Sequence, residues 1–121
     1  MAAQDVAAQE GCLFCGIVAG DVPAEIVRIG RRVVAFRDIN PQAPLHVLVI
    51  PRDHYDNAAA LAAGDPEALA ELVEVGADLA AGQTDSGAFR LVFNTGAETG
   101  QSVFHAHGHV LAGRRFSWPP G

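Results

Sequence analysis

The sequence predicts a single α+β domain built on an antiparallel sheet of about five strands and two helices. The length of 121 residues suits one domain, and the 50% apolar share of the residues suits one core. Segments with the apolar pattern of strands outnumber those with the pattern of helices, and the turns between them are short. Short turns favour antiparallel neighbours, with the helices expected on one face of the sheet.

Five segments fit strands because their apolar residues alternate or run continuously between turn residues. They are residues 25–30, 32–38, 45–50, 88–94 and 105–111. The third segment is the most apolar of the chain, so it is expected at the centre of the sheet.

Two segments fit helices. An apolar pattern over 14–18 predicts a short helix that ends at Gly20. A second helix is expected to begin at Asp65 and Pro66, because aspartate is a preferred N-cap and proline is favoured at the first helical position. Its leucines and valines recur at helical spacing up to Gly82, which predicts one buried face.

The net charge of −6 argues against a general affinity for nucleic acid, which needs a basic surface. The chain has no run of 18 apolar residues, so we expect no membrane span. Residues 1–11 lack the basic start and apolar middle of a signal peptide. We expect them to be a disordered N-terminal tail of a cytoplasmic protein, ahead of a single domain over residues 12–121.

The main functional signal is the segment 105–111, which holds three of the five histidines at alternate positions: His105, His107 and His109. On a strand, alternate side chains lie on one face about 6.5 Å apart, a spacing that suits a phosphate group held among imidazoles. On a helix the same residues would point in different directions. Isolated histidines are often core or surface residues, and a histidine-rich tract can also bind metal. Strict alternation beside a glycine-rich approach favours a functional site.

The run 100–111 resembles the signature of the histidine triad (HIT) family of nucleotide hydrolases and transferases, in which three histidines alternate with apolar residues. The segment 38–51 and the ending Trp-Pro-Pro-Gly over 118–121 resemble the Hint branch of that family. The resemblance implies the HIT-like fold, with the sheets of two chains joined across a two-fold dimer. Gly108 departs from the pattern, since a larger apolar residue is usual in its slot. It is expected to face away from the histidines and to change only the packing behind them.

The resemblance also implies a reaction, the hydrolysis of purine nucleoside 5′-monophosphoramidates such as AMP linked to an amine. His107 would attack the α-phosphorus and form a nucleotidyl-histidine intermediate that water cleaves. Other residues implied in catalysis bond the phosphate, order the site or lie near the leaving group: His109, His105, His46 and Ser102. Histidine suits the nucleophile's role because its unperturbed pKa of about 6.5 leaves neutral imidazole at neutral pH. No cofactor is required for this catalysis.

Further residues match family positions that bind the nucleotide. Asp38 would accept hydrogen bonds from the ribose hydroxyls, and a turn-forming aspartate is the simpler alternative. Phe14, Ile17 and Ile39 would form an apolar slot for the base, or simply belong to the core. The other residues that the resemblance implies in nucleotide binding would lie at the phosphate, on the approach to the histidines or on the tail that reaches the other subunit: Asn94, Gln101, Ser102 and Trp118.

Cys12 and Cys15 form a Cys-x-x-Cys pair that fits a redox pair, half of a zinc site or two small core residues. A structural disulfide is not expected in a cytoplasmic protein. Some bacterial members of the family hold zinc on such a pair together with two histidines, at positions that match His54 and His105. Zinc prefers four such ligands in a tetrahedron, so structural zinc is one of the open alternatives.

Two other functions stay open. A dinucleoside polyphosphate hydrolase or nucleotidyl transferase of the same fold would turn over diadenosine polyphosphates faster than phosphoramidates, although Gln101, Ser102 and the C-terminal tail speak against it. A nucleotide-binding scaffold dimer would keep its partners when His107 is replaced by alanine. The expected partners are a purine nucleotide, as an AMP or GMP derivative, and a second copy of the chain.

Overall fold

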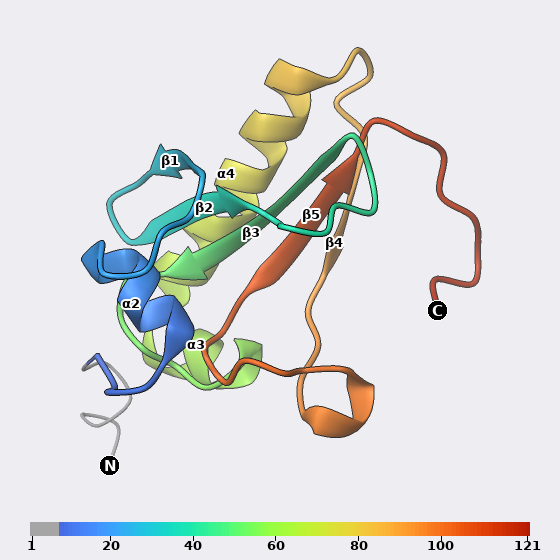
Figure 1. Cartoon of the computed structure of the whole chain (residues 1–121). Helices are drawn as coiled ribbons and strands as arrows, with labels where there is room; N and C mark the ends of the chain where they lie inside the picture. The colour runs from blue at the N-terminus through green and yellow to red at the C-terminus, as the bar shows by residue number, and fades with distance from the viewer. Residues whose placement is uncertain (1–7) are drawn as a thin grey trace.

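Residues 8–121 are described by a computed structural model (Figure 1). Of the tail expected over 1–11, residues 1–7 lie outside the described residues. The described remainder leads into the first helix through a turn, in which the Cys12 N–H donates to the Gln9 carbonyl oxygen at 3.1 Å.

The described residues contain one five-stranded antiparallel sheet with the order β1-β2-β3-β5-β4. The strands are β1 (Ile26–Ile29), β2 (Val33–Arg37), β3 (Leu45–Pro51), β4 (Phe89–Val92) and β5 (Gly108–Ala112). The first four agree with the predicted segments to within two residues at each end. The most apolar segment, β3, lies at the centre of the sheet as expected.

Three α-helices and one short 3-10 helix occur in the described part of the chain: α2 (Leu13–Ala19), α3 (Ala58–Gly64), α4 (Pro66–Gln83) and η1 (Ala97–Thr99). Helix α3 was not expected, because it is alanine-rich and its only buried side chain, Leu61, gives no apolar periodicity. Asp65 caps α4 as predicted, its side chain accepting the Ala68 N–H at 3.1 Å. Within residues 8–121, no helix has both the length and the apolar character needed to cross a membrane.

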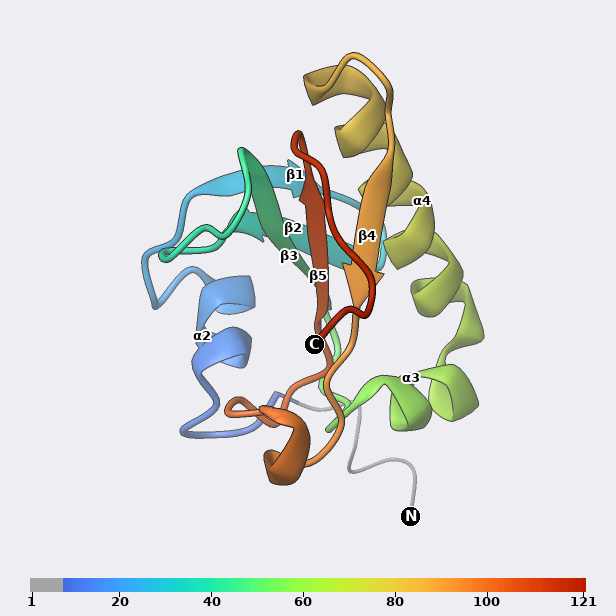
Figure 2. The same ribbon diagram turned by 90° about the vertical axis from the view of Figure 1, so that its right-hand side faces the viewer.

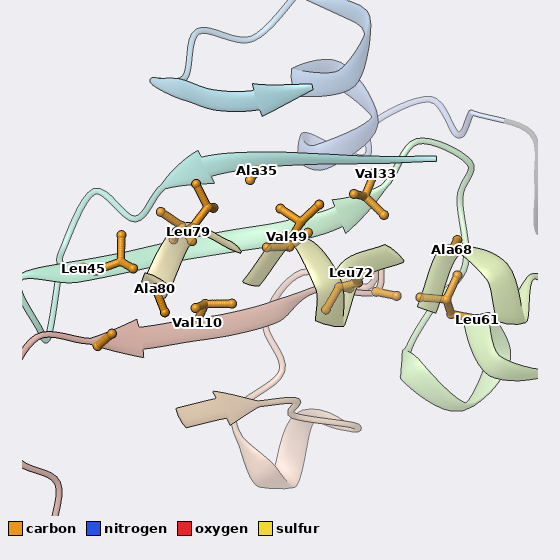
Figure 3. Packing of buried hydrophobic residues seen from close by; sticks show 14 of the residues in the cluster. Val33, Ala35, Leu45, Val49, Leu61, Ala68, Leu72, Leu79, Ala80 and Val110 are labelled. Atoms are coloured by element: carbon orange, nitrogen blue, oxygen red, sulfur yellow. The ribbon is translucent and has the colours of Figure 1, made fainter. Parts of the chain in front are cut away.

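The helices cover both faces of the sheet, so the expectation of helices on one face was wrong (Figure 2). Helix α2 packs on one face, where Phe14 and Ile17 join the buried residues Val34, Phe36, Leu48 and Ile50. Helix α4 packs on the other face, where Leu72, Leu79 and Ala80 meet Val33, Val49 and Val110 (Figure 3). Every residue of β3 is buried, which explains why all of its residues except His46 are apolar: a strand covered on both sides has no solvent-exposed face.

The histidine segment is only partly a strand, which corrects the prediction of a strand over 105–111. Strand β5 begins at Gly108, so of the three histidines only His109 lies on it. The segment before it leaves the ladder because its Ala106 N–H donates to the Tyr55 carbonyl oxygen instead. The alternation of faces nevertheless continues. Ala106 and Val110 are buried among the residues packed against α4, whereas the rings of His105 and His107 contact Phe14 of α2.

Candidate functional site

His107 lies where α2, β5 and the segment before β5 meet, and its ring is held in one orientation. Its Nδ1–H donates to the His105 carbonyl oxygen at 2.8 Å. A carbonyl oxygen can only accept, so the hydrogen of the neutral ring is on Nδ1 and Nε2 carries the lone pair. The Phe14 ring stands edge-on to it, with centroids 5.1 Å apart. The Nε2 lone pair of the neutral His107 ring is therefore free of this hydrogen bond, and the residue is 9% exposed.

His46 and His109 form a hydrogen-bonded pair across β3 and β5, the neighbouring strands. The Gln42 N–H donates to His46 Nδ1 at 3.0 Å, so the hydrogen of the neutral His46 ring is on Nε2. That Nε2–H donates to His109 Nδ1, also at 3.0 Å. His109 therefore carries its own hydrogen on Nε2, where it can donate to an anion. The prediction that His46 lies with the histidine segment is confirmed by the β3–β5 pairing.

Burial keeps this pair uncharged near neutral pH. It lowers the pKa of His46 below the usual value, with Asp38 acting in the opposite direction. Burial also lowers the pKa of His109 to about 4, helped by the neighbouring His107 and His46 and opposed by Asp38. Neutral rings with defined tautomers suit hydrogen-bond donation more than ion pairing.

Asp38 follows β2 and lies beside the pair. Its Oδ2 is 3.5 Å from His46 Nε2 and 4.0 Å from His109 Nδ1. Its Oδ1 accepts the Asn40 N–H at 2.8 Å, so the turn-forming role holds. The donor atoms of Asp38, His46 and His109 lie close enough to hold a metal. The 3.0 Å contact between the two imidazoles is instead a good hydrogen bond, with the proton placed by Gln42.

A second cluster brings Cys12, Cys15, His54 and His105 together, with all ligand atoms within 4.8 Å of one another. Cys15 Sγ is 3.3 Å from His54 Nδ1, and both sulfur atoms are 3.5 Å from His105 Nδ1. Tetrahedral zinc with Zn–S of about 2.3 Å and Zn–N of about 2.0 Å requires donor separations of about 3.3 to 3.8 Å. The three separations above lie in this range, and the remaining ones are within 4.8 Å, so the four side chains are a candidate zinc-binding set.

The outer contacts of both histidines direct a lone pair into the cluster. His54 Nε2–H donates to Asp56 Oδ1 at 3.0 Å, and His105 Nε2–H donates to the Pro51 carbonyl oxygen at 2.9 Å. Each Nδ1 is thus unprotonated, which is the arrangement that metal-bound histidines adopt. The rings are 2% and 0% exposed, respectively.

The sulfur atoms are also held in place by the backbone. The Cys15 N–H donates to Cys12 Sγ at 3.3 Å, and the Gln9 N–H donates to Cys15 Sγ at 3.4 Å. Both cysteines are free thiols, and burial raises the pKa of Cys15 above the usual value. Without metal the thiol groups can donate to the imidazole nitrogens at these distances, while a metal would replace those protons.

His105 belongs to both parts of the site. Its ring nitrogen faces the two sulfur atoms, and its carbonyl oxygen accepts the hydrogen bond that orients His107. Position 105 therefore connects the cysteine–histidine cluster directly to His107.

A model of the HIT domain matches residues 19–116. The chain belongs to the HIT domain family. An uncharacterized HIT-like protein of Synechocystis is 47% identical over 116 residues, which cover 93% of this chain and 98% of that protein. The 14 kDa zinc-binding protein of Zea mays is 39% identical, with 90% of this chain and 87% of that protein covered. The crystal structure of a HIT family hydrolase from Legionella pneumophila has a TM-score of 0.85 at 43% identity, covering 92% of this chain and all of that one (100%).

The predicted base-binding residues of this HIT domain do not lie together on one open surface. Phe14 and Ile17 are core residues at 5% and 8% exposure, and Phe14 reaches the site through its ring contact with His107. Ile39 is fully exposed, at 101%. Trp118 is 82% exposed on the C-terminal segment, which runs away from α2 (Figure 1).

The approach to the histidines is built around Gln101. This buried side chain accepts the Gly96 N–H at 2.8 Å and donates to the carbonyl oxygens of Asp56 and Val103, at 2.7 Å and 3.1 Å. The Gln101 amide thus fixes the loop over residues 94–103 that leads to the histidines. The neighbouring Ser102 is exposed and lines a cavity of about 320 Å³ together with Cys12, His54 and Phe104, among others. Asn94 is half-buried near Gly100, at the start of the same loop.

Sequence reasoning missed the groups that orient the rings of the HIT domain. Most belong to the backbone, namely the Gln42 N–H and the carbonyl oxygens of Pro51 and His105, and no side-chain pattern indicates them. Asp56 is the exception. A carboxylate two positions after His54 is a signal that could have been found, because metal-bound histidines commonly donate to a carboxylate.

Proposed function

We propose that this HIT domain hydrolyses purine nucleoside 5′-monophosphoramidates, with His107 as the nucleophile. The observation that carries the proposal is the hydrogen bond from His107 Nδ1–H to the His105 carbonyl oxygen, which leaves Nε2 as the reactive nitrogen. Hydrolysis as the class of reaction is supported by the Legionella relative, which is named a HIT family hydrolase. Assignment to the Hint branch rests on Ser102 and the Trp-Pro-Pro ending.

The reaction would take place in two displacements at phosphorus. The His107 Nε2 lone pair forms a bond to the α-phosphorus while the P–N bond to the amine breaks. Water then attacks phosphorus, breaks the bond to Nε2 and releases AMP. Over the cycle, one proton of water goes to the amine and the hydroxyl goes to phosphorus, so the enzyme is unchanged.

The remaining residues would bind charge and substrate. His109 Nε2–H is available for a phosphoryl oxygen, since its Nδ1 accepts from His46. Asp38 Oδ2 would accept from the ribose hydroxyls, as its Oδ1 is used by Asn40. Ser102 would lie at the leaving amine and Asn94 at the phosphate. The base would lie between Ile39 and the surface of the α2 core, formed by Phe14 and Ile17.

The test is AMP release from an amine-linked AMP by the wild type and by His107→Ala. We expect the variant to lose at least about a thousandfold in rate, which corresponds to about 4 kcal/mol of barrier. Wild type denatured at alkaline pH, where a P–N bond to histidine survives, should gain the mass of one nucleotidyl group, and His107→Ala should not. Near-wild-type turnover by the variant would refute the nucleophile. Faster turnover of diadenosine polyphosphates than of phosphoramidates would refute the substrate class.

We also propose that Cys12, Cys15, His54 and His105 hold one structural zinc ion. The donor separations and the outward hydrogen bonds of both histidines support this, as does the name of the Zea mays relative, a zinc-binding protein. The metal would supply no chemistry to the reaction. It would hold α2 to the segment that carries His107.

Metal analysis of protein purified without a histidine tag tests the zinc site. We expect about one zinc per chain, lost as the pH is lowered because protons compete with the metal for the thiolates. The raised pKa of Cys15 strengthens that competition. Cys15→Ser should release the metal. A content below about a tenth of a zinc per chain would remove the proposal.

We further propose a homodimer joined at β4. The strand order leaves β1 and β4 as sheet edges. Strand β1 has a register shift between Ile26 and Arg28, a bulge of the kind that discourages edge pairing. Strand β4 pairs with β5 in regular register and is half-buried throughout. Its free side is therefore the edge we assign to a second chain, and Trp118 would contact substrate across that dimer.

A further inference from the structure

The segment after β5 holds the loop between β2 and β3 through Arg114. The Nε–H of this exposed arginine donates to the Gln42 carbonyl oxygen at 2.9 Å, and Nη1 donates to the Arg115 carbonyl oxygen at 2.8 Å. The guanidinium lies over the Phe116 ring, 4.1 Å from its centroid. The side chain is therefore fixed at three places.

A second contact brings the same two segments together. Gly113 has a φ of +95°, and a Cβ atom at this position would lie 2.9 Å from Pro44 Cβ. Only glycine can accept both the positive φ and this close approach without strain. The backbone at 113 thus packs directly on the loop, next to the point where Arg114 reaches Gln42.

Gln42 is the residue that places the proton on His46. Its N–H donates to His46 Nδ1, and its carbonyl oxygen accepts from Arg114. Both groups flank the same Cα atom, so restraining the carbonyl also restrains the N–H. The loop has no regular secondary structure around Gln42, and the Gln42 side-chain amide donates to the Asn40 carbonyl oxygen at 3.0 Å.

We propose that Arg114 is a positioning residue that fixes the tautomers of His46 and His109 through the Gln42 backbone. Its effect on the reaction rests on the function proposed above, whereas its effect on the tautomers does not. Arg114 donates to Gln42, Gln42 donates to His46, and His46 donates to His109. The last ring in this series then presents Nε2–H to the substrate.

Loss of the hydrogen bond from Arg114 to Gln42 would allow the hydrogen bond between His46 and His109 to reverse its direction. With Gln42 displaced, His46 can carry its hydrogen on Nδ1 and present a lone pair at Nε2 to His109. His109 can then hold its hydrogen on Nδ1, directed at His46 or at Asp38 Oδ2, which is 4.0 Å away. Its Nε2 would meet a phosphoryl oxygen with a lone pair instead of a hydrogen, which is repulsive. The transition state would lose a donor while the ground-state contacts of base and ribose remain.

The experiment combines ring 15N NMR of histidine-labelled protein with steady-state kinetics. The variants are Arg114→Ala, Arg114→Lys and the matched control Arg115→Ala, which removes an adjacent exposed arginine whose carbonyl alone takes part in the network. Thermal unfolding of each variant checks that it is folded. Phe116→Leu, which removes the ring beneath the guanidinium together with that ring's contact to Arg90, is the second variant if Arg114→Ala is unstable.

We expect wild-type His46 and His109 to be Nε2–H tautomers, and Arg114→Ala to redistribute hydrogen toward Nδ1 in at least one of them. The kcat for P–N hydrolysis should fall by about tenfold with KM within about twofold. Arg114→Lys should recover part of both effects, and Arg115→Ala should match the wild type. Unchanged tautomers in Arg114→Ala, or equal changes in Arg115→Ala, would overturn the proposal. Wild type that hydrolyses no phosphoramidate would refute the proposed function, while the tautomers would still decide the role of Arg114.

Discussion

Gly108 shows that a single missing side chain sets how closely the sheet approaches α4. A Cβ atom there would lie 2.9 Å from Leu91 Cδ1, 3.0 Å from Leu72 Cδ2 and 3.1 Å from Phe93 Cε1. These apolar side chains fill the space that a larger residue would occupy. As expected, Gly108 departs from the family pattern only in the packing on the side of the strand that faces away from the histidines.

We predict that Gly108→Ala destabilises the protein by about 1 to 3 kcal/mol, because the added methyl group overpacks this contact. Urea unfolding at neutral pH measures it. The control is Gly82→Ala in α4, where nothing lies within 4 Å of the added atom. That change should be neutral or stabilising by up to about 1 kcal/mol. Equal stability of Gly108→Ala and wild type would contradict the packing argument.

The buried histidine pair makes stability depend on pH in a defined window. The pKa of His46 is lowered, and that of His109 is lowered to about 4, whereas both titrate near 6.5 in an unfolded chain. Between those values the unfolded state binds more protons, so the free energy of unfolding decreases as the pH falls from about 6.5 toward about 4. Above about pH 7 both states are neutral and the effect is absent.

We therefore predict a shallower pH dependence of stability in His109→Gln than in wild type. Each histidine contributes at most about 1.4 kcal/mol per pH unit. Denaturant unfolding between pH 4.5 and 7.5 gives both curves, and their difference cancels the carboxylates that titrate in either protein. Parallel curves would show that His109 is not buried in its neutral form.

Among the helices and strands, the sequence predicted those whose apolar residues or capping residues form a local pattern. The strands and the start of α4 follow from apolar alternation and from Asp65 as N-cap. Helix α3 was missed because alanines carry no facial pattern, and the packing of α2 was missed because the buried face of a short helix does not say which side of a sheet it covers.

Strand β5 begins at Gly108, later than the predicted start at residue 105, for a specific physical reason. Proline has no N–H, so Pro51 ends the ladder of β3 on the side that faces the histidine segment. Its carbonyl oxygen accepts from the His105 ring, and Ala106 turns to Tyr55. An apolar–histidine alternation therefore predicts which face each ring takes, but not how far the strand extends.

Removal of the proposed zinc should destabilise α2 and the segment before β5 more than α4, which packs on the opposite face of the sheet. We predict that a zinc chelator lowers the melting temperature and speeds amide hydrogen exchange in α2 and over 105–107, since the cluster is what joins these segments. Exchange in α4, which packs on the opposite face, should change little. Equal acceleration in both helices, or none in either, would contradict a local structural role.

For the whole molecule, the candidate site gathers on the α2 face from β2, β3, β5 and the loops beside them. The alternating histidines and the Cys-x-x-Cys pair could be found from their spacing, whereas His54 was implied only by the family resemblance. The contacts that orient them could not, because the Gln42 N–H and the Pro51 and His105 carbonyl oxygens are present in every sequence and become specific only in the fold.

We predict that sedimentation equilibrium gives twice the chain mass of 12.6 kDa. Amide hydrogen exchange should be slow in β4 and fast in β1, because only the edge paired with a second chain is protected. A monomer at micromolar concentration, or protection of β1 instead, would contradict the assigned interface.

The His105 side chain faces the two cysteine sulfur atoms, while its main-chain carbonyl oxygen orients the His107 ring. Every amino acid has a main-chain carbonyl oxygen, so the hydrogen-bond partner of His107 Nδ1 does not depend on which residue occupies position 105. A related protein could have apolar residues in place of Cys12, Cys15, His54 and His105 and still keep this hydrogen bond. The proposed zinc site and the proposed reaction could thus be gained or lost separately, although His105 contributes to both.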